Sequence, residues 1–308
     1  MIIIRMSGGL GNQMFMYSFA RSIQCKTNEK IYISRYCYRH LGDNYTKREF
    51  ALNCFRMRRN VKILPYFWEL FFEQIFKLKR MCYQYKNIGR IINNDKDFME
   101  LTKYGIYQSD DMFRHYKKCS VKSKMKFVDG FFMSWKYFDN HASLLRKDFC
   151  FRIKPSQENA HLLQEIEQCN AVCVHIRLGD YLSKEFKKSN YLCTEDYFIK
   201  AMDEIYRITK EPEFYIFSTS KEDIAYIKNN FPFRYPVKYV ELGNVDYEEL
   251  RLMATCKHFI LSNSSFSWWA QYLSTNKAKV VVAPSRWQNN QGQYTKDLYQ
   301  EDWLTVEV

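Results

Sequence analysis

The residues best suited to chemistry lie between 171 and 181, where an apolar run ends in the charged cluster His175-Ile-Arg-Leu-Gly-Asp180. Side chains alternate along a strand, so His175 and Arg177 are expected to share one face. The opposite face then carries Val172, Val174 and Ile176. The forked guanidinium of Arg177 suits phosphate oxygens. Two interpretations fit this segment alone: an anion site at the carboxyl edge of a sheet, or an Arg177 to Asp180 ion pair that closes a turn beside a buried His175.

Two other segments also end a predicted strand in a loop that opens a helix. Strand 1–6 leads into Ser7-Gly-Gly-Leu-Gly-Asn-Gln13, and the helix that follows has an apolar stripe. The stripe consists of Phe15, Phe19 and Ile23. Glycine permits positive φ, and Asn12 is expected to cap the helix. Strand 258–262 leads into Asn263-Ser-Ser-Phe-Ser267 and a helix over 266–274. Helix N-termini bind anions, so three such edges predict a diphosphate site, although ordinary capping explains either loop alone.

These segments resemble the hallmark motifs of the α-1,2-fucosyltransferases of glycosyltransferase family 11. The three main motifs are Gly8-Gly-Leu-Gly-Asn-Gln-Met14, the 175–181 segment and Ser262-Asn-Ser-Ser-Phe-Ser-Trp-Trp269. Supporting matches lie at 130–138, 246–253 and 281–287, in the family's order. The resemblance implies an α/β, GT-B-like enzyme with two Rossmann-like domains facing a cleft. It also implies inverting transfer of L-fucose from GDP-β-L-fucose to the 2-hydroxyl of a terminal galactose on a glycan, with no cofactor and no essential metal ion.

The predicted site follows from what this chemistry needs. Negative charge grows on the leaving phosphate, and a guanidinium with helix N-termini can stabilise it in place of a metal ion. The predicted catalytic residues are Arg177, Asp180, His175 and Asn12. The predicted substrate-binding residues are Gly9, Gly11, Gln13, Glu249, Asn263, Ser264, Ser265 and Phe266.

Individual roles rest on similarity and on chemistry. By similarity, the carboxylate of Glu249 accepts from the guanine edge, where relatives usually carry aspartate. Phe266 is expected either to pack on the ribose or base or to be buried. Asp180 is favoured as the base or the group that orients the acceptor, with Glu185 and His175 as alternatives.

Some residues depart from the family pattern. Leu178 stands where many members have a second arginine, and Phe217-Ser-Thr-Ser220 replaces a common Phe-Ser-Asp-Asp. The second change puts a usual nucleotide contact in doubt. Asp95-Lys-Asp97 spells the D-x-D pattern of metal-dependent glycosyltransferases, but such short acidic patterns arise easily by chance. We therefore predict no metal site.

Length and charge agree with this interpretation. The chain has 308 residues, which predicts two domains: 1–154, with the glycine loop and the acceptor side, and 155–308, a Rossmann-like GDP-fucose domain. The formal net charge of +13 indicates an anionic partner. No signal peptide precedes the first strand, which predicts a cytoplasmic protein. The alternatives are a related enzyme with another GDP-sugar or a protein acceptor, and a non-catalytic nucleic-acid or nucleotide-binding protein, although no nucleic-acid partner is predicted.

The pattern of elements is strongly α/β after residue 170. Strands are predicted at 171–177, 213–217, 237–241, 258–262 and 279–283, separated by helices. Earlier, the basic and aromatic segment 56–90 contains a helical stretch over 66–83. This helix either faces the core with a solvated basic rim or lies peripherally on an anionic inner membrane face, with Lys77, Lys79 and Arg80 near the headgroups.

Overall fold

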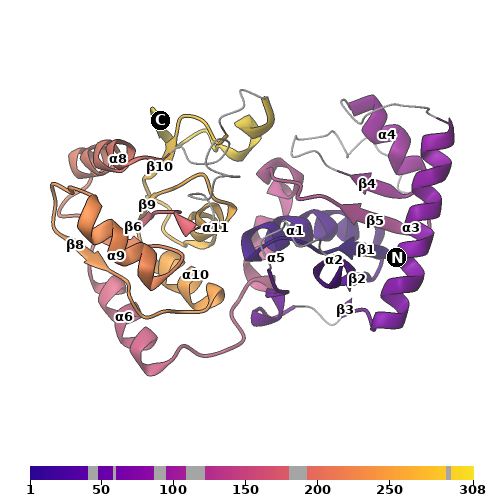
Figure 1. Ribbon diagram of the computed structural model, residues 1–308, viewed down its shortest axis with the longest axis horizontal. Coiled ribbons are helices and arrows are strands. Elements are labelled where there is room, and N and C mark those ends of the chain that lie inside the picture. The colour runs from indigo at the N-terminus through magenta and orange to yellow at the C-terminus, as the bar shows by residue number, and fades with distance from the viewer. Residues whose placement is uncertain (41–47, 58–59, 87–94, 109–121, 180–192, 289–292) are drawn as a thin grey trace. The chain divides into compact units, whose positions relative to one another are not determined.

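The computed structural model describes residues 1–40, 48–57, 60–86, 95–108, 122–179, 193–288 and 293–308 (Figure 1). The chain divides into two compact units, Met1–Arg152 with Lys296–Leu298, and Ile153–Thr295 with Tyr299–Val308. Each unit contains a parallel sheet with helices. The predicted α/β class and the two Rossmann-like units are confirmed.

The first unit is built around a five-stranded sheet with the order β3-β2-β1-β5-β4, in which all neighbours are parallel. Its elements are β1 (Ile2–Arg5), α1 (Leu10–Thr27), β2 (Ile31–Ser34), α2 (Tyr36–Arg39), β3 (Val61–Ile63), α3 (Tyr66–Lys86), α4 (Asp95–Lys103), β4 (Ile106–Gln108), β5 (Lys126–Asp129) and α5 (Ala142–Asp148). Strand order reverses between β1 and β5, so the glycine loop after β1 lies at a topological switch point.

Helices cover this sheet because alternate strand residues are apolar on both faces. The predicted stripe of α1 is fully buried, with Phe15, Phe19 and Ile23 at 0% exposure. On the other face, Phe72 and Phe76 of α3 pack in one cluster with Ile3 and Phe127 of the sheet. The core-facing interpretation of this helix is therefore confirmed for its inner face. Among the described residues, no helix combines the length and hydrophobicity needed to cross a bilayer.

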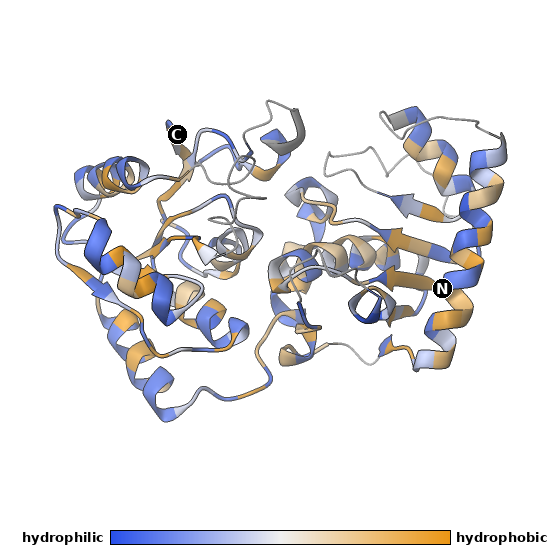
Figure 2. Cartoon of the chain, in the orientation of Figure 1, coloured by the Kyte–Doolittle hydropathy of each residue, from blue (hydrophilic) through white to orange (hydrophobic). Residues whose placement is uncertain are grey.

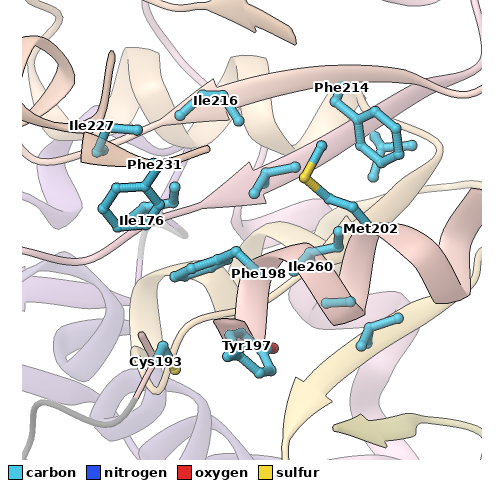
Figure 3. Close-up of a cluster of buried hydrophobic side chains, with 14 of the residues drawn as sticks. Ile176, Cys193, Tyr197, Phe198, Met202, Phe214, Ile216, Ile227, Phe231 and Ile260 are labelled. Carbon is cyan, nitrogen blue, oxygen red and sulfur yellow. The ribbon is translucent and has the colours of Figure 1, made fainter. Parts of the chain in front are cut away.

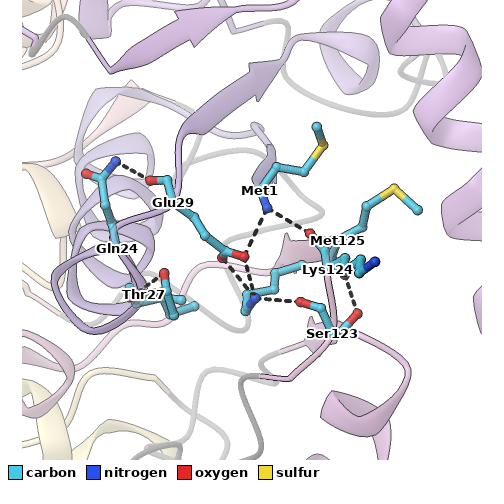
Figure 4. A network of polar contacts seen from close by, with 9 residues as sticks. Met1, Gln24, Thr27, Glu29, Ser123, Lys124 and Met125 are labelled. Carbon is cyan, nitrogen blue, oxygen red and sulfur yellow. Dashed lines mark hydrogen bonds and ion pairs between the residues drawn. The ribbon is translucent and has the colours of Figure 1, made fainter.

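A polar network fastens the amino end of the first sheet (Figure 4). The Met1 amino group donates to the Lys124 carbonyl at 2.7 Å and pairs with the Glu29 carboxylate at 3.1 Å. The Lys126 ammonium, only 1% exposed, pairs with the same carboxylate at 2.8 Å. These charges lie at the end of the sheet opposite the glycine loop.

The second unit has a six-stranded parallel sheet with the order β11-β10-β9-β6-β7-β8. Its elements are α6 (Gln157–Gln168), β6 (Ala171–His175), α8 (Glu195–Ile208), β7 (Glu213–Phe217), α9 (Lys221–Asn230), β8 (Val237–Tyr239), α10 (Asp246–Thr255), β9 (His258–Ile260), α11 (Ser265–Leu273), β10 (Val281–Pro284) and β11 (Leu304–Val306). The next two strands in the chain, β7 and β8, lie on one side of β6, and the last three, β9, β10 and β11, lie on the other. This is the order of a Rossmann sheet.

The core of the second unit confirms the predicted alternation in β6. Val172, Val174 and Ile176 join one hydrophobic cluster with Phe198 of α8 and Ile227 of α9 (Figure 3). Leu178 also lies in this cluster, fully buried. On the opposite face, α10 packs against α6 and α11. The polar residues of β6 are thereby directed to the side of α11.

Candidate active site

The candidate site lies at the carboxyl edge of the second sheet, where β6 and β9 are neighbours. From β6 the sheet continues through β7 and β8 in one direction, and from β9 it continues through β10 and β11 in the other. The junction of β6 and β9 is therefore a topological switch point, the place where open α/β sheets bind ligands. The segments 175–179 and 261–265 follow these two strands.

His175 ends β6 and is held in place by the loop after β9. Its side chain is 3% exposed, and its Nδ1 is hydrogen bonded to the hydroxyl of Ser262 at 2.8 Å. Its ring centroid lies 5.9 Å from that of Phe266. Burial, together with the nearby Arg177 guanidinium, lowers the pKa of His175 to about 3. The imidazole is therefore neutral at physiological pH, and it links the two loops without adding charge.

Arg177 supplies the positive charge at this edge. Its side chain is half-buried, and its Nη1 donates to the Thr219 hydroxyl at 3.1 Å. Thr219 follows β7, which pairs with β6 so that His175 lies opposite Phe217. The register of these two strands thus brings the guanidinium and the hydroxyl together. A planar cation oriented in this way suits an anionic ligand.

Gly179 is held near the carboxyl edge by a contact with α9. Its φ of 46° is in the left-handed region that favours glycine, and its N–H donates to the Asp223 carboxylate at 3.3 Å. Asp223 lies in the first turn of α9, where a carboxylate also complements the helix dipole. The Ser220 hydroxyl accepts from the Asp223 N–H at 3.1 Å and caps the same helix. The position of Gly179 therefore depends on α9.

The serine loop after β9 opens α11. The Ser264 hydroxyl accepts from the Phe266 N–H at 3.2 Å, and the Ser267 hydroxyl donates to the Ser262 and Ser264 carbonyls at 3.2 and 3.1 Å. The Asn263 amide donates to the Trp287 carbonyl at 3.0 Å. The Ser264 and Ser267 side chains thus bond within the loop, and that of Asn263 bonds to a segment outside it. The more accessible residues are Ser265 and Phe266, which begin the helix at its positive dipole end.

Glu249 lies in the first turn of α10, and helix N-termini in a parallel α/β sheet lie at the carboxyl edge of the strands. Its carboxylate accepts from the Asn244 amide at 3.1 Å. Burial raises the pKa of Glu249 to about 7, and the charge of Asp246 acts in the same direction. A half-buried carboxylate with this pKa is suited to accept hydrogen bonds from a ligand that presents N–H donors.

The glycine loop of the first unit follows β1. Gly8 has a φ of 73°, and a Cβ at this position would lie 2.9 Å from the Asn12 amide nitrogen and 3.0 Å from the Phe131 ring. Only glycine fits this turn without displacing a neighbour. The prediction that Asn12 caps the helix is wrong. Helix α1 begins at Leu10, its N-cap is Gly9 with no side-chain hydrogen bond, and Asn12 lies inside the first turn.

Gln13, predicted to bind substrate, is fully buried and tied to the backbone. Its amide nitrogen donates to the Gly8 carbonyl at 3.0 Å and the Glu49 carbonyl at 2.7 Å, while its oxygen accepts from the Ala51 N–H at 2.9 Å. These contacts give Gln13 a structural function, because they hold the glycine loop to the segment 49–51. Gly9 and Gly11 lie beside it at the start of α1.

Comparison with known proteins decides the family of this chain. Residues 1–307 match the family described as Glycosyl transferase family 11. The chain belongs to this family. It is 30% identical over 311 residues to an Alpha-1,2-colitosyltransferase of Escherichia coli, with 99% of each chain covered. The chain is therefore a glycosyltransferase of family 11, as its motifs indicated.

Two other matches to this family 11 chain are more distant. A Galactoside 2-alpha-L-fucosyltransferase of Caenorhabditis elegans is 29% identical over 209 residues, with 62% of this chain and 55% of the relative covered. Among solved structures, the fucosyltransferase NodZ from Bradyrhizobium matches with a TM-score of 0.49 and 15% identity over 88% of this chain and 92% of NodZ.

Two predicted residues, Asp180 of the 175–181 motif and the alternative base Glu185 beyond it, lie outside the described residues. Asp97 of the D-x-D pattern is in α4 and 7% exposed. Within the described ranges, no three His, Cys, Asp or Glu side chains gather in a way that could hold a metal ion. Because Asp180 and Glu185 are not described, the assignment of the acceptor base stays a prediction.

Sequence reasoning missed Thr219 and Asp223 in this glycosyltransferase. It noted only that Phe217-Ser-Thr-Ser220 departs from the family pattern. In the structure these residues have definite contacts: Ser218 donates to the Ile176 carbonyl at 2.7 Å, and Thr219 accepts from Arg177. The signal that could have found them is the pairing of β6 with β7. When two strands are parallel, residues that follow paired positions by the same number of residues lie side by side.

Proposed function

We propose that this family 11 enzyme transfers L-fucose from GDP-β-L-fucose to the 2-hydroxyl of a terminal galactose on a glycan, with inversion at the anomeric carbon. The observation that carries the proposal is the juxtaposition of Arg177, the neutral His175 and the start of α11 at the switch point of the second sheet. The names of two relatives, an alpha-1,2 and a 2-alpha transferase, support transfer to position 2 in α linkage.

We assign the diphosphate of the donor to the edge formed by Arg177, Ser264 and Ser265. As the bond from the sugar C1 to the β-phosphate breaks, negative charge moves onto the leaving phosphate oxygens. The guanidinium and the positive end of α11 stabilise that charge. His175 positions the loop through Ser262. Because its pKa is low, the imidazole is neutral and adds no second positive charge beside Arg177.

The nucleoside of the donor is assigned to the same unit. By similarity we assign the guanine edge to Glu249, because an ionised carboxylate can accept both the N1–H and the N2–H of guanine. Phe266, half-buried beside His175, is placed to pack against the ribose or base. The contributions of Asn12, Gly9 and Gly11 on the acceptor side stay predictions, and so does the assignment of residues 1–154 to the acceptor.

A different donor is the second candidate, because the relative that matches over 99% of the chain is a colitosyltransferase. The deciding assay measures GDP release from GDP-fucose with a panel of galactosides, followed by determination of linkage and anomeric configuration by NMR. We expect an α-1,2-linked fucoside. Transfer from a nucleotide-activated colitose but not from GDP-fucose would revise the donor, and a product linked elsewhere would revise the acceptor position.

No metal ion is assigned to this reaction, since the cation and the helix end supply the charge that a metal would provide. Chelation with EDTA is expected to leave the initial rate largely unchanged. Loss of activity that manganese restores would instead assign a metal to Asp95 and Asp97.

We assign the proton transfer to Asp180, as base or as the group that orients the acceptor. Asp180→Asn keeps the size of the side chain but removes its basicity. This variant should bind GDP normally and lose most of the transfer rate. If it transfers at the wild-type rate while Glu185→Gln does not, the base is Glu185.

A further inference from the structure

Helix α3 exposes a long apolar face that no part of the proposed reaction uses. In Figure 2, hydrophobic and hydrophilic residues alternate along this helix, which Figure 1 shows along one side of the first unit. Its exposed side chains include aromatic residues that are normally buried: Phe67 is 71% exposed, Phe71 47% and Tyr85 83%. An exposed apolar surface of this kind marks an interaction site.

The exposed residues form one continuous stripe. They recur at alternating intervals of four and three residues over 67–85, which keeps them on one side of a helix with about 3.6 residues per turn. The exposed positions are Phe67, Phe71, Gln74, Leu78, Met81 and Tyr85, and Gln74 is the one polar residue among them. Beside it, Trp68 is 46% exposed and its ring packs edge-on against Phe71 with centroids 5.5 Å apart. The stripe therefore presents a nearly unbroken hydrophobic surface to its surroundings.

The acidic residues of α3 are directed away from this stripe. Its only two acids, Glu69 and Glu73, are 0% and 5% exposed. Glu73 receives two hydrogen bonds from Arg5, both at 3.0 Å. Glu69 is paired with Arg39 and accepts from the backbone N–H of Arg35 at 2.8 Å. The negative charges of the helix are thus used inside the unit.

The charges beside the stripe are positive. Lys77 and Arg80 are exposed on α3, and Lys77 lies 5.9 Å from the ring centroid of Tyr36 in α2. Arg35, the N-cap of α2, and Arg39, its last residue, share the single carboxylate of Glu69, and each side chain remains 36% exposed. The surroundings of the stripe therefore carry a net positive charge, in keeping with the formal net charge of +13 for the whole chain.

We propose that this face of α3 docks the protein on an anionic membrane surface, with the apolar stripe among the lipid headgroups and acyl chain ends. A helix with one apolar face and flanking cations binds such surfaces through buried apolar area and attraction to anionic lipids. Aromatic side chains such as Trp68 and Tyr85 favour the membrane interface. A second copy of the chain is the poorer partner, because pairing two such faces would bring cations together without an exposed acid on either α3.

The proposal is independent of the sugar transfer reaction and is tested by vesicle flotation of the full chain. The probes are vesicles of phosphatidylethanolamine with phosphatidylglycerol, and vesicles of phosphatidylcholine alone as the neutral comparison. We expect the protein to float with the anionic vesicles only, and added salt to weaken binding. Phe67→Gln/Leu78→Gln should weaken binding about ten-fold or more, because both side chains leave the stripe.

Charge is tested with a second pair of variants. Lys77→Gln/Arg80→Gln should weaken binding to anionic vesicles about 20-fold, since each cation near the surface contributes a factor of about five. Lys147→Gln/Lys200→Gln removes the same charge from exposed positions elsewhere and should change binding little. Ile208→Gln/Tyr226→Gln is the matched apolar control, with side chains 47% and 44% exposed in the second unit. Unchanged melting temperatures would establish that all variants fold.

Three outcomes would overturn the proposal. The first is a wild-type protein that does not float with anionic vesicles. The second is equal loss of binding in the stripe variant and in its apolar control. The third is a dimer, measured by light scattering, that Phe67→Gln/Leu78→Gln converts to a monomer while vesicle binding is absent or unchanged. That result would assign the stripe to a second copy of the chain.

Discussion

Each sheet of this glycosyltransferase carries an arginine at the carboxyl end of the strand where the strand order reverses. Arg5 ends β1, and its guanidinium is held by Glu73 through two 3.0 Å bonds, by Asp129 and by the ring of Phe76, 4.0 Å away. Arg177 follows β6 and donates to the neutral hydroxyl of Thr219 at 3.1 Å. The comparison shows that equivalent positions in two Rossmann-like sheets hold arginines with different partners. Carboxylates hold Arg5 inside its unit, whereas Arg177 is the arginine that we propose binds the diphosphate of the donor.

The loops after the two switch-point strands differ in a related way. The glycine loop is held from outside, by the Gln13 amide and by the Tyr38 hydroxyl, which donates to the Gly8 carbonyl at 2.8 Å. The serine loop combines hydroxyl bonds of its own, which open α11, with bonds to His175 and to the Trp287 carbonyl. Substitutions in the two regions should therefore separate stability from activity.

The largest effect is expected for Arg5→Ala. This change leaves Glu73, 4% exposed, without its bidentate partner, which should lower the free energy of unfolding by about 3–5 kcal/mol. Urea denaturation measures it. Arg207→Ala is the matched control, because Arg207 is 70% exposed in its pair with Glu204 and should cost less than about 1 kcal/mol. Equal stability of Arg5→Ala and the wild type would refute the structural function of Arg5.

Arg177→Ala should have the opposite profile. Removing a charge-assisted contact to the leaving diphosphate is expected to lower kcat/KM by about 100-fold or more, with the urea midpoint unchanged. Initial rates with GDP-fucose and circular dichroism test both parts. Near-normal turnover would rule out the diphosphate assignment.

Glu249 should make donor binding depend on pH by about ten-fold. With a pKa of about 7, its ionised fraction rises from about one-tenth at pH 6 to about nine-tenths at pH 8, and only the carboxylate accepts both guanine N–H groups. The Kd of GDP-fucose, measured by calorimetry, should fall over this range. Glu249→Gln should abolish the dependence, whereas His175 cannot supply it because its pKa is about 3.

The same raised pKa has a consequence for stability. The folded state holds the Glu249 proton more tightly than the unfolded chain does, so this group stabilises the fold at low pH. That contribution is lost as the pH rises from the ordinary glutamate range through about 7. If the free energy of unfolding of Glu249→Gln depended on pH to the same extent as that of the wild type, another group would be responsible.

The smallest effects are expected at the two helix N-caps. Ser264→Ala removes the side-chain cap of α11 and should cost about 1 kcal/mol of stability. Gly9→Ala should change stability by less than about 1 kcal/mol, because Gly9 has an ordinary φ of −77° and a Cβ there would meet only Arg48 Cδ at 3.9 Å. Thermal unfolding of both variants makes the comparison, and a larger loss in Gly9→Ala would contradict it.

Local pattern predicted much of this protein. The strand over Glu213–Phe217 has the predicted bounds, and the stripe of Phe15, Phe19 and Ile23 is buried as its spacing indicated. The β6 face with Val172 and Val174 was also predicted. These features are set by side-chain periodicity and by the burial of apolar residues, which neighbouring residues in the chain already express.

Contacts between distant segments depend on which strands pair in the sheet, and local pattern does not predict this pairing. Ser262 meets His175 across 87 residues, and Thr219 meets Arg177 across 42. Gln13 bonds to residues 36 and 38 positions away, and these bonds hold the glycine loop to the segment 49–51. A local pattern predicts that a segment forms a strand but not which strands lie beside it in the sheet. The order of the strands follows from the packing of the whole unit, and this order determines which polar groups meet at its carboxyl edge.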